Sequence, residues 1–160
     1  LALLRACAGG RLAGEAASDA DLHEVYAVVG GNPHALRVVG GQLLIFGLDV
    51  VLADLRAMRS RRVEQLYAHI YRRAWEGLNA AERHLLLAMA AVDAGGETLD
   101  YIMRLADLDD RLVLDGIETL VVRNLVEQRA QNRTVRYTIH NLTRTFLYQQ
   151  IVDWGAAAGG

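Results

Sequence analysis

The sequence predicts a mainly α-helical chain in which a small helical subdomain precedes a winged helix-turn-helix domain with a two-stranded β-hairpin wing. Apolar residues recur at helical spacing through most of the 160 residues, most regularly between Val63 and Leu78. The period then changes, because Val135, Tyr137 and Ile139 alternate with polar residues as in a half-buried strand. Three helices, a hairpin and a final helix, in this order, are typical of a winged helix.

The first part of the chain, residues 1–58, is expected to form the helical subdomain. Gly9-Gly10 is expected to end a short first helix. Asn32 is expected to cap a later one, because its side chain can accept a backbone N–H of the first turn. Pro33 follows it at the first helical position, where the missing N–H of proline has no intrahelical partner to lose.

The second part, residues 59–154, is expected to be the winged-helix domain with a long leading helix, and residues 155–160 a disordered tail. A basic and poorly patterned stretch at 56–62 separates the two parts. Polar capping residues open the three helices that follow the leading one. They are Asn79, Thr98 and the pair Asp109-Asp110.

The predicted wing lies close to the end of this domain. We expect its first strand at 125–129, a polar turn at 130–133 and its second strand at 134–139. A last helix is expected from Asn141, with that residue as its cap. The wing therefore leads directly into the final helix.

Composition excludes several functions. All 17 basic residues counted as Lys or Arg are arginine, so the chain has no lysine for a phosphate-binding loop and is not expected to be an enzyme by itself. The single cysteine forms no internal disulfide, and the histidines have no metal-ligand spacing and are expected to be solvated or partly buried. The net charge of −2 and the lack of a long apolar run predict a cytoplasmic protein that does not bind membranes.

Two short motifs carry a family resemblance that covers nearly the whole chain. The stretch Gly30–Leu36, reading GGNPHAL, resembles the Gly-x-Pro-Leu-Ala-Leu turn of NB-ARC proteins, a type of STAND signalling ATPase. The stretch Tyr137–Arg144, reading YTIHNLTR, is similar to the Met-His-Asp region that follows the winged-helix wing in that family. The resemblance implies a regulatory fragment that senses whether ADP or ATP is bound to an upstream P-loop domain, and that switches conformation.

The resemblance also implies roles for individual residues. Pro33 would lie beside the adenine, and His140 would contact the β-phosphate of ADP. ADP or ATP would be bound only in the full-length protein, which would be an ATPase, and not by the fragment alone. The expected partners are the upstream P-loop domain in cis and, on activation, a second copy or an effector protein. Ile139 and Asn141 stand where the family has Met and Asp, so any salt bridge of that acid is absent.

Two other functions remain open. A winged helix can be the DNA-binding module of a transcriptional regulator, with Arg129, Arg133 and Arg136 of the wing as its DNA contacts. The expected recognition helix is acidic, however, and phosphates would repel it, so DNA is the less favoured partner. The third function is a protein-interaction scaffold in which neither motif meets a nucleotide.

Overall fold

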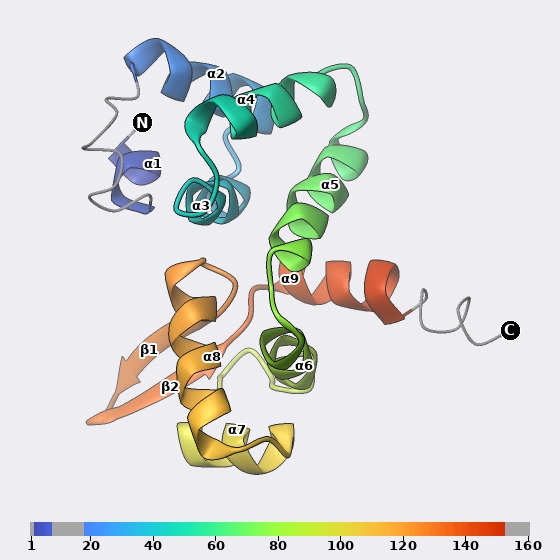
Figure 1. Cartoon of the computed structure of the whole chain (residues 1–160). Coiled ribbons are helices and arrows are strands. Elements are labelled where there is room, and N and C mark those ends of the chain that lie inside the picture. The colour runs from blue at the N-terminus through green and yellow to red at the C-terminus, as the bar shows by residue number, and fades with distance from the viewer. Residues whose placement is uncertain (1, 8–17, 153–160) are drawn as a thin grey trace, which may run out of the picture. The chain divides into compact units, whose positions relative to one another are not determined.

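The computed structural model describes residues 2–7 and 18–152, which form helices joined by short turns and a β-hairpin (Figure 1). The chain divides into two compact units, Leu1–Ala74 and Trp75–Gly160, and each is described by itself. The sequence-based boundary was placed earlier, between residues 58 and 59. The predicted helix end at Gly9-Gly10 and the predicted tail at 155–160 lie outside the described residues.

The secondary structure of the first unit, among its described residues, consists of helices joined by turns. It contains α1 (Ala2–Cys7), α2 (Asp19–Val29), α3 (Pro33–Gln42), α4 (Leu48–Ala57) and most of α5 (Val63–Glu76). Helix α3 packs against α1 and α2, and α2 also packs against α4. Apolar side chains from one face of each helix are removed from water and form the core. They include Leu4, Leu22, Val25, Val29, Val38, Val39, Leu52 and Leu55.

Polar side chains tie α5 to the helices that precede it. The side-chain amide of Gln42 donates to the carbonyl of Ile70 over 2.7 Å, and this bond is buried. Asp54 of α4 lies 2.8 Å from the Nε2 atom of His69 and accepts from Arg73 over 3.2 Å. His69 and Arg73 share one face of α5 because they are four residues apart. A single carboxylate therefore holds two successive turns of this helix.

The second unit has the element order of a winged helix (Figure 1). Helices α6 (Ala80–Met89), α7 (Leu99–Ala106) and α8 (Asp110–Val122) precede strands β1 (Glu127–Gln131) and β2 (Thr134–Thr138). Helix α9 (Asn141–Phe146) follows and continues as a π-helical segment, η2 (Leu147–Val152). This order confirms the predicted fold class. Among the described residues, no helix is both long and apolar enough to span a lipid bilayer.

The core of the second unit lies between α6, α7 and α8. Helix α6 packs against both of the others. Gly116 of α8 faces Leu85 so closely that a Cβ atom at this glycine would lie 2.8 Å from the leucine Cδ2 atom. The helices approach at this point because the glycine has no side chain. Buried side chains fill the rest of the core: Leu85, Leu86, Met89, Ile102, Val113, Ile117, Leu120 and Leu147.

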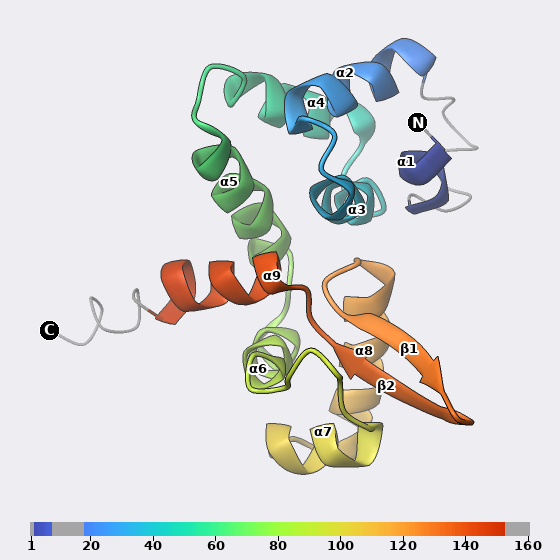
Figure 2. The same ribbon diagram turned by 180° about the vertical axis from the view of Figure 1, so that it is seen from behind.

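The wing is displaced from its predicted position. Strand β1 spans Glu127–Gln131 and not 125–129, and it pairs antiparallel with β2 from Glu127 opposite Thr138 to Gln131 opposite Thr134 (Figure 2). Leu125 and Val126 are each 2 % exposed, and both backbone N–H groups donate to the Leu120 carbonyl at the end of α8. These two apolar residues therefore complete the helical core and do not begin the strand.

The predicted four-residue turn at 130–133 is shorter in the structure. Only Asn132 and Arg133 separate the strands, and both have positive φ, at 47° and 66°. Two successive positive φ angles give a tight hairpin whose twist matches that of the strands, and asparagine tolerates this conformation better than most residues. The turn therefore places Arg133 at the tip of the wing.

A short third strand contact was not predicted from the sequence. Glu97 forms an isolated antiparallel bridge with Tyr137, with N···O distances of 3.0 and 2.9 Å between their backbones. Gly96 precedes it with φ +76°, and a Cβ atom there would lie 3.0 Å from the Tyr137 carbonyl oxygen. The bridge fastens the loop between α6 and α7 to the wing.

An exposed ion pair joins α2 to α4 in the first unit. The Nε and Nη2 atoms of Arg56 donate to the two carboxylate oxygens of Glu24, over 2.8 and 2.7 Å. These hydrogen bonds hold the pKa of Glu24 below its ordinary value of 4.5. Desolvation opposes them, and the charges of Arg56 and Arg59 add to the lowering. The ion pair stabilises the folded state fully at pH values above the ordinary carboxyl pKa range. This stabilisation is lost as pH falls through the lowered pKa of Glu24.

Arg56→Gln should raise the pKa of Glu24 toward 4.5, because the charged hydrogen-bond donor is removed. An NMR titration of the Glu24 carboxyl carbon measures this directly. Arg104→Gln, which changes an exposed arginine of the second unit, is the control and should leave the titration unchanged. A Glu24 pKa that stays the same in Arg56→Gln would show that the ion pair does not form in solution.

Candidate functional site

The start of α3 carries the first of the two motif residues. Asn32 caps this helix as predicted, since its side-chain oxygen accepts the N–H groups of His34 and Ala35 over 3.0 and 3.1 Å. Pro33 is the first helical residue and is exposed, whereas the two residues after it are buried. The cap orients an exposed proline ring at a fixed helix start, which is the position that the resemblance assigns to an adenine contact.

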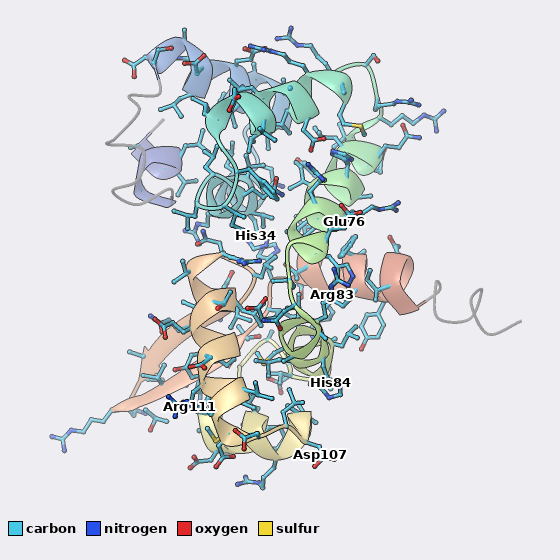
Figure 3. All side chains as sticks on the ribbon, viewed as in Figure 1. His34, Glu76, Arg83, His84, Asp107 and Arg111 are labelled. Atoms are coloured by element: carbon cyan, nitrogen blue, oxygen red, sulfur yellow. The ribbon has the colours of Figure 1, made fainter. Side chains whose placement is uncertain are left out.

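His34 is more buried than the sequence suggested. Its exposed fraction is 7 %, and its ring stacks on Tyr71 of α5 with centroids 6.2 Å apart and an angle of 27° between the planes. Figure 3 labels this side chain below α3. The NB-ARC turn that this stretch resembles has leucine at the corresponding position, and His34 is buried here. Packing of His34 against Tyr71 therefore helps to hold the start of α3, where Pro33 lies, in place.

The strand-to-helix corner after the wing carries the second motif residue. His140 has extended backbone angles and is the N-cap of α9, because its Nδ1 atom accepts the N–H of Leu142 over 3.1 Å. Asn141 is the first helical residue, so the prediction that it caps the helix was wrong. The physical reason is where β2 ends, since the chain is still extended at His140 and turns helical only at the next residue.

The capping bond defines the chemistry of the His140 ring. A nitrogen that accepts a hydrogen bond carries no proton, so the neutral ring holds its proton on Nε2. That nitrogen is therefore the donor of the ring, and it lies beside the positive end of a helix, where backbone N–H groups favour an anion. In this tautomer the Nε2–H group can donate to an acceptor such as a phosphate oxygen.

Buried hydrogen bonds hold this corner in place. Thr138 is 2 % exposed, and its hydroxyl donates to the Asp93 carbonyl over 2.8 Å. Arg144, one turn into α9, donates to the Ala90 carbonyl after the end of α6. Residues on both sides of His140 are thus fixed to the segment that follows α6, and the imidazole is positioned by the folded core of its own unit.

The structure assigns the two motif residues to different units. Pro33 lies in the first unit and His140 in the second. Pro33 is exposed at the start of α3, and His140 is the cap of α9. The shared nucleotide site that would include both residues stays a prediction.

The outer face of α8 is the recognition surface of a winged helix, and here it is acidic and apolar. Three carboxylates are exposed along it, Asp110, Asp115 and Glu118. Arg111, which Figure 3 labels, is the one exposed arginine between the helix ends. Its apolar side chains are also accessible to water. Their exposed fractions are 46 % for Leu112, 47 % for Leu114 and 53 % for Val122.

Two of the three wing arginines predicted as DNA contacts bind within their own domain. Arg129 donates to the Glu127 carboxylate over 2.9 Å and to the Ala94 carbonyl over 3.4 Å. Arg136 donates to the Gly96 carbonyl over 2.9 Å and lies 3.7 Å from the Glu97 carboxylate. Both side chains fasten the wing to the loop after α6. Arg133, in the exposed turn, remains the candidate for an outside contact.

The link between α5 and α6 is held by two arginines that the sequence analysis did not single out. Arg83 donates to the carbonyls of Trp75 and Glu76 over 3.1 and 3.0 Å, and its guanidinium lies 5.6 Å from the Trp75 ring centre (Figure 3). Arg123 donates to the Gly77 carbonyl over 2.6 Å. Carbonyls at a helix C-terminus lack intrahelical partners, and basic side chains commonly satisfy them. The sequence signal that could have indicated these bonds was an arginine at helical spacing beyond the end of α5.

Comparison with known proteins agrees with the fold of the second unit. Residues 78–151 match a family of winged helix-turn-helix domains. A search of curated proteins finds no match. This part of the chain is therefore a winged helix-turn-helix domain, whereas the NB-ARC resemblance of the whole chain remains an expectation.

Thr138→Val should lower the free energy of unfolding by about 1–2 kcal/mol, because the shape is kept and the buried hydrogen bond to Asp93 is lost. Urea denaturation followed by circular dichroism measures the change. Thr134→Val, at an exposed position at the start of the same strand, is the matched control and should change stability much less. Equal stability of Thr138→Val and the wild type would show that this bond does not hold the His140 corner.

Proposed function

We propose that this chain is the regulatory part of a nucleotide-switched signalling ATPase of the NB-ARC type, and that its winged helix acts in the cytoplasm through protein contacts. The observation that carries the proposal is the outer face of α8, where three carboxylates and three exposed apolar side chains accompany a single arginine. A regulatory part of this kind needs a protein partner for its winged helix and does not need DNA.

The charge of this face argues against DNA as the partner. Duplex DNA carries about one negative charge per 1.7 Å of its axis, and proteins bind it chiefly by neutralising phosphates with basic side chains. Asp115 and Glu118 would be brought toward that charge if α8 entered the major groove. Exposed leucine and valine side chains on the same face gain free energy when a protein surface covers them.

The nucleotide role is supported by local geometry at both motif residues. Pro33 is exposed at a capped helix start, and Nε2 is the donor atom of the His140 ring because Nδ1 accepts from Leu142. By the resemblance, these groups contact the adenine and the β-phosphate of ADP. The chain has no lysine, so a P-loop domain elsewhere in the protein would bind the phosphates and hydrolyse ATP. The described chain would contribute to the control of the switch and not to catalysis.

His140→Asn should release ADP about tenfold faster from a longer protein that carries the P-loop domain. Asparagine is a strong helix cap, so α9 keeps its start, while the Nε2–H donor to the phosphate is lost. Displacement of a fluorescent ADP analogue in a stopped-flow instrument measures the rate. His23→Asn, at an exposed position on α2, is the matched control and should not change it.

An ADP release rate that is unchanged in His140→Asn would contradict the proposal. The isolated 160-residue chain provides a second comparison. Calorimetry should detect weak ADP binding or none, because the phosphates would lack their P-loop. Tight binding of ADP by the isolated chain would also contradict the assignment.

A DNA-binding module of a transcriptional regulator is the second candidate, because the domain match is to a winged helix-turn-helix family, and this match favours DNA binding over nucleotide switching. Arg133 at the wing tip is the side chain placed to touch a phosphate. This candidate predicts salt-sensitive binding to duplex DNA that Arg133→Glu weakens in a gel-shift titration. Binding that is insensitive to this change would remove the wing contact from consideration.

A further inference from the structure

A strongly basic exposed surface lies in the first unit, at the turn between α4 and α5. Every residue from 59 to 65 is exposed, and Arg59, Arg61 and Arg62 give this segment its charge. Val63 beside them has an exposed fraction of 58 %. We call residues 59–63 the basic turn. It presents arginines and an accessible apolar side chain, although the role proposed for the chain gives it no function.

The neighbouring arginine does not belong to this surface. Arg56 is held by both oxygens of Glu24, so its charge is already balanced within the first unit. Arg61 and Arg62 lie further along the chain, beyond the end of α4. These two exposed arginines do not belong to the Arg56–Glu24 ion pair.

The outer face of α8 has the opposite composition. Its three carboxylates and one arginine leave an excess of two negative charges. The three arginines of the basic turn, together with the adjacent Glu64, leave an excess of two positive charges. Each surface also exposes a valine, which is Val122 on α8 and Val63 in the basic turn. Oppositely charged patches of similar size attract and align each other, and burial of the apolar groups then adds stability.

We propose that the outer face of α8 binds the basic turn of a second copy of this chain. The contact joins two different surfaces, so it is heterologous. The overall charge of −2 is small enough for two chains to approach without strong repulsion. The contact requires neither nucleotide nor the NB-ARC assignment.

The contact depends on exposed charges, and salt should weaken it. The screening length falls to about 3 Å at 1 M salt, which removes most of the attraction between exposed side chains. Sedimentation velocity of the 160-residue chain over a range of concentrations should show species larger than a monomer at low salt. The same samples at 1 M salt should be monomeric.

Charge reversal on each surface identifies the residues involved. The pair Asp115→Arg with Glu118→Arg reverses the acidic face, and the pair Arg61→Glu with Arg62→Glu reverses the basic turn. Each double variant should weaken self-association at least tenfold, because like charges then face each other across the contact. All four side chains are exposed, so the fold should be kept, which circular dichroism can verify. Asp100→Arg on α7 is the control and should associate like the wild type.

A mixture of the two double variants provides the decisive observation. The reversed α8 face of one variant is complementary to the reversed turn of the other, so the mixture should recover larger species that neither variant forms alone. This recovery requires two different chains and cannot arise from contacts within one chain. A wild type that is monomeric at every concentration would overturn the proposal, as would a mixture that stays monomeric.

Discussion

The close packing of α6 against α8 determines what the rest of the second unit can do. Gly116 lets α8 approach Leu85, and the inner side of α8 is buried in the core, including Val113 and Leu120. The part of α8 that a partner can reach is its outer face, with its carboxylates and exposed aliphatic side chains. The same core receives Leu125 and Val126 and so sets where the wing begins. Position and chemistry of the recognition surface thus follow from one helix pair.

The sequence predicted the winged helix because the change from helical to alternating period is a local signal. The sequence placed the first wing strand too early because residues 125 and 126 are apolar, as either strand residues or core residues would be. Only their packing in the folded core distinguishes the two possibilities. The bridge at Glu97 involves one residue and has no period to detect. The cap of α9 was assigned to Asn141 on propensity, whereas the end of β2 gives that place to His140. The strand and bridge errors come from contacts between residues far apart in sequence, and the cap error comes from the local point at which the chain turns helical.

The candidate site was predicted unevenly for the same reason. Asn32 and Pro33 form a helix start whose signals lie in adjacent residues, and the structure shows it as expected. Arg129 and Arg136 could be recognised as wing residues, but their bonds to the loop after α6 join parts of the chain far apart in sequence. Those bonds change the interpretation, because an arginine that fastens a wing is less suited to bind phosphate. The acidic face of α8 could be predicted from composition, and the structure adds that its apolar residues are exposed.

If the outer face of α8 serves a protein partner and not DNA, the chain should not bind duplex DNA. Fluorescence anisotropy of labelled duplex DNA, titrated with the 160-residue chain at low and at high salt, measures this. The wild type should not bind at low salt, and salt-sensitive binding should appear when Asp115→Arg and Glu118→Arg reverse the face. Wild-type binding that weakens with salt as phosphate contacts require would contradict it.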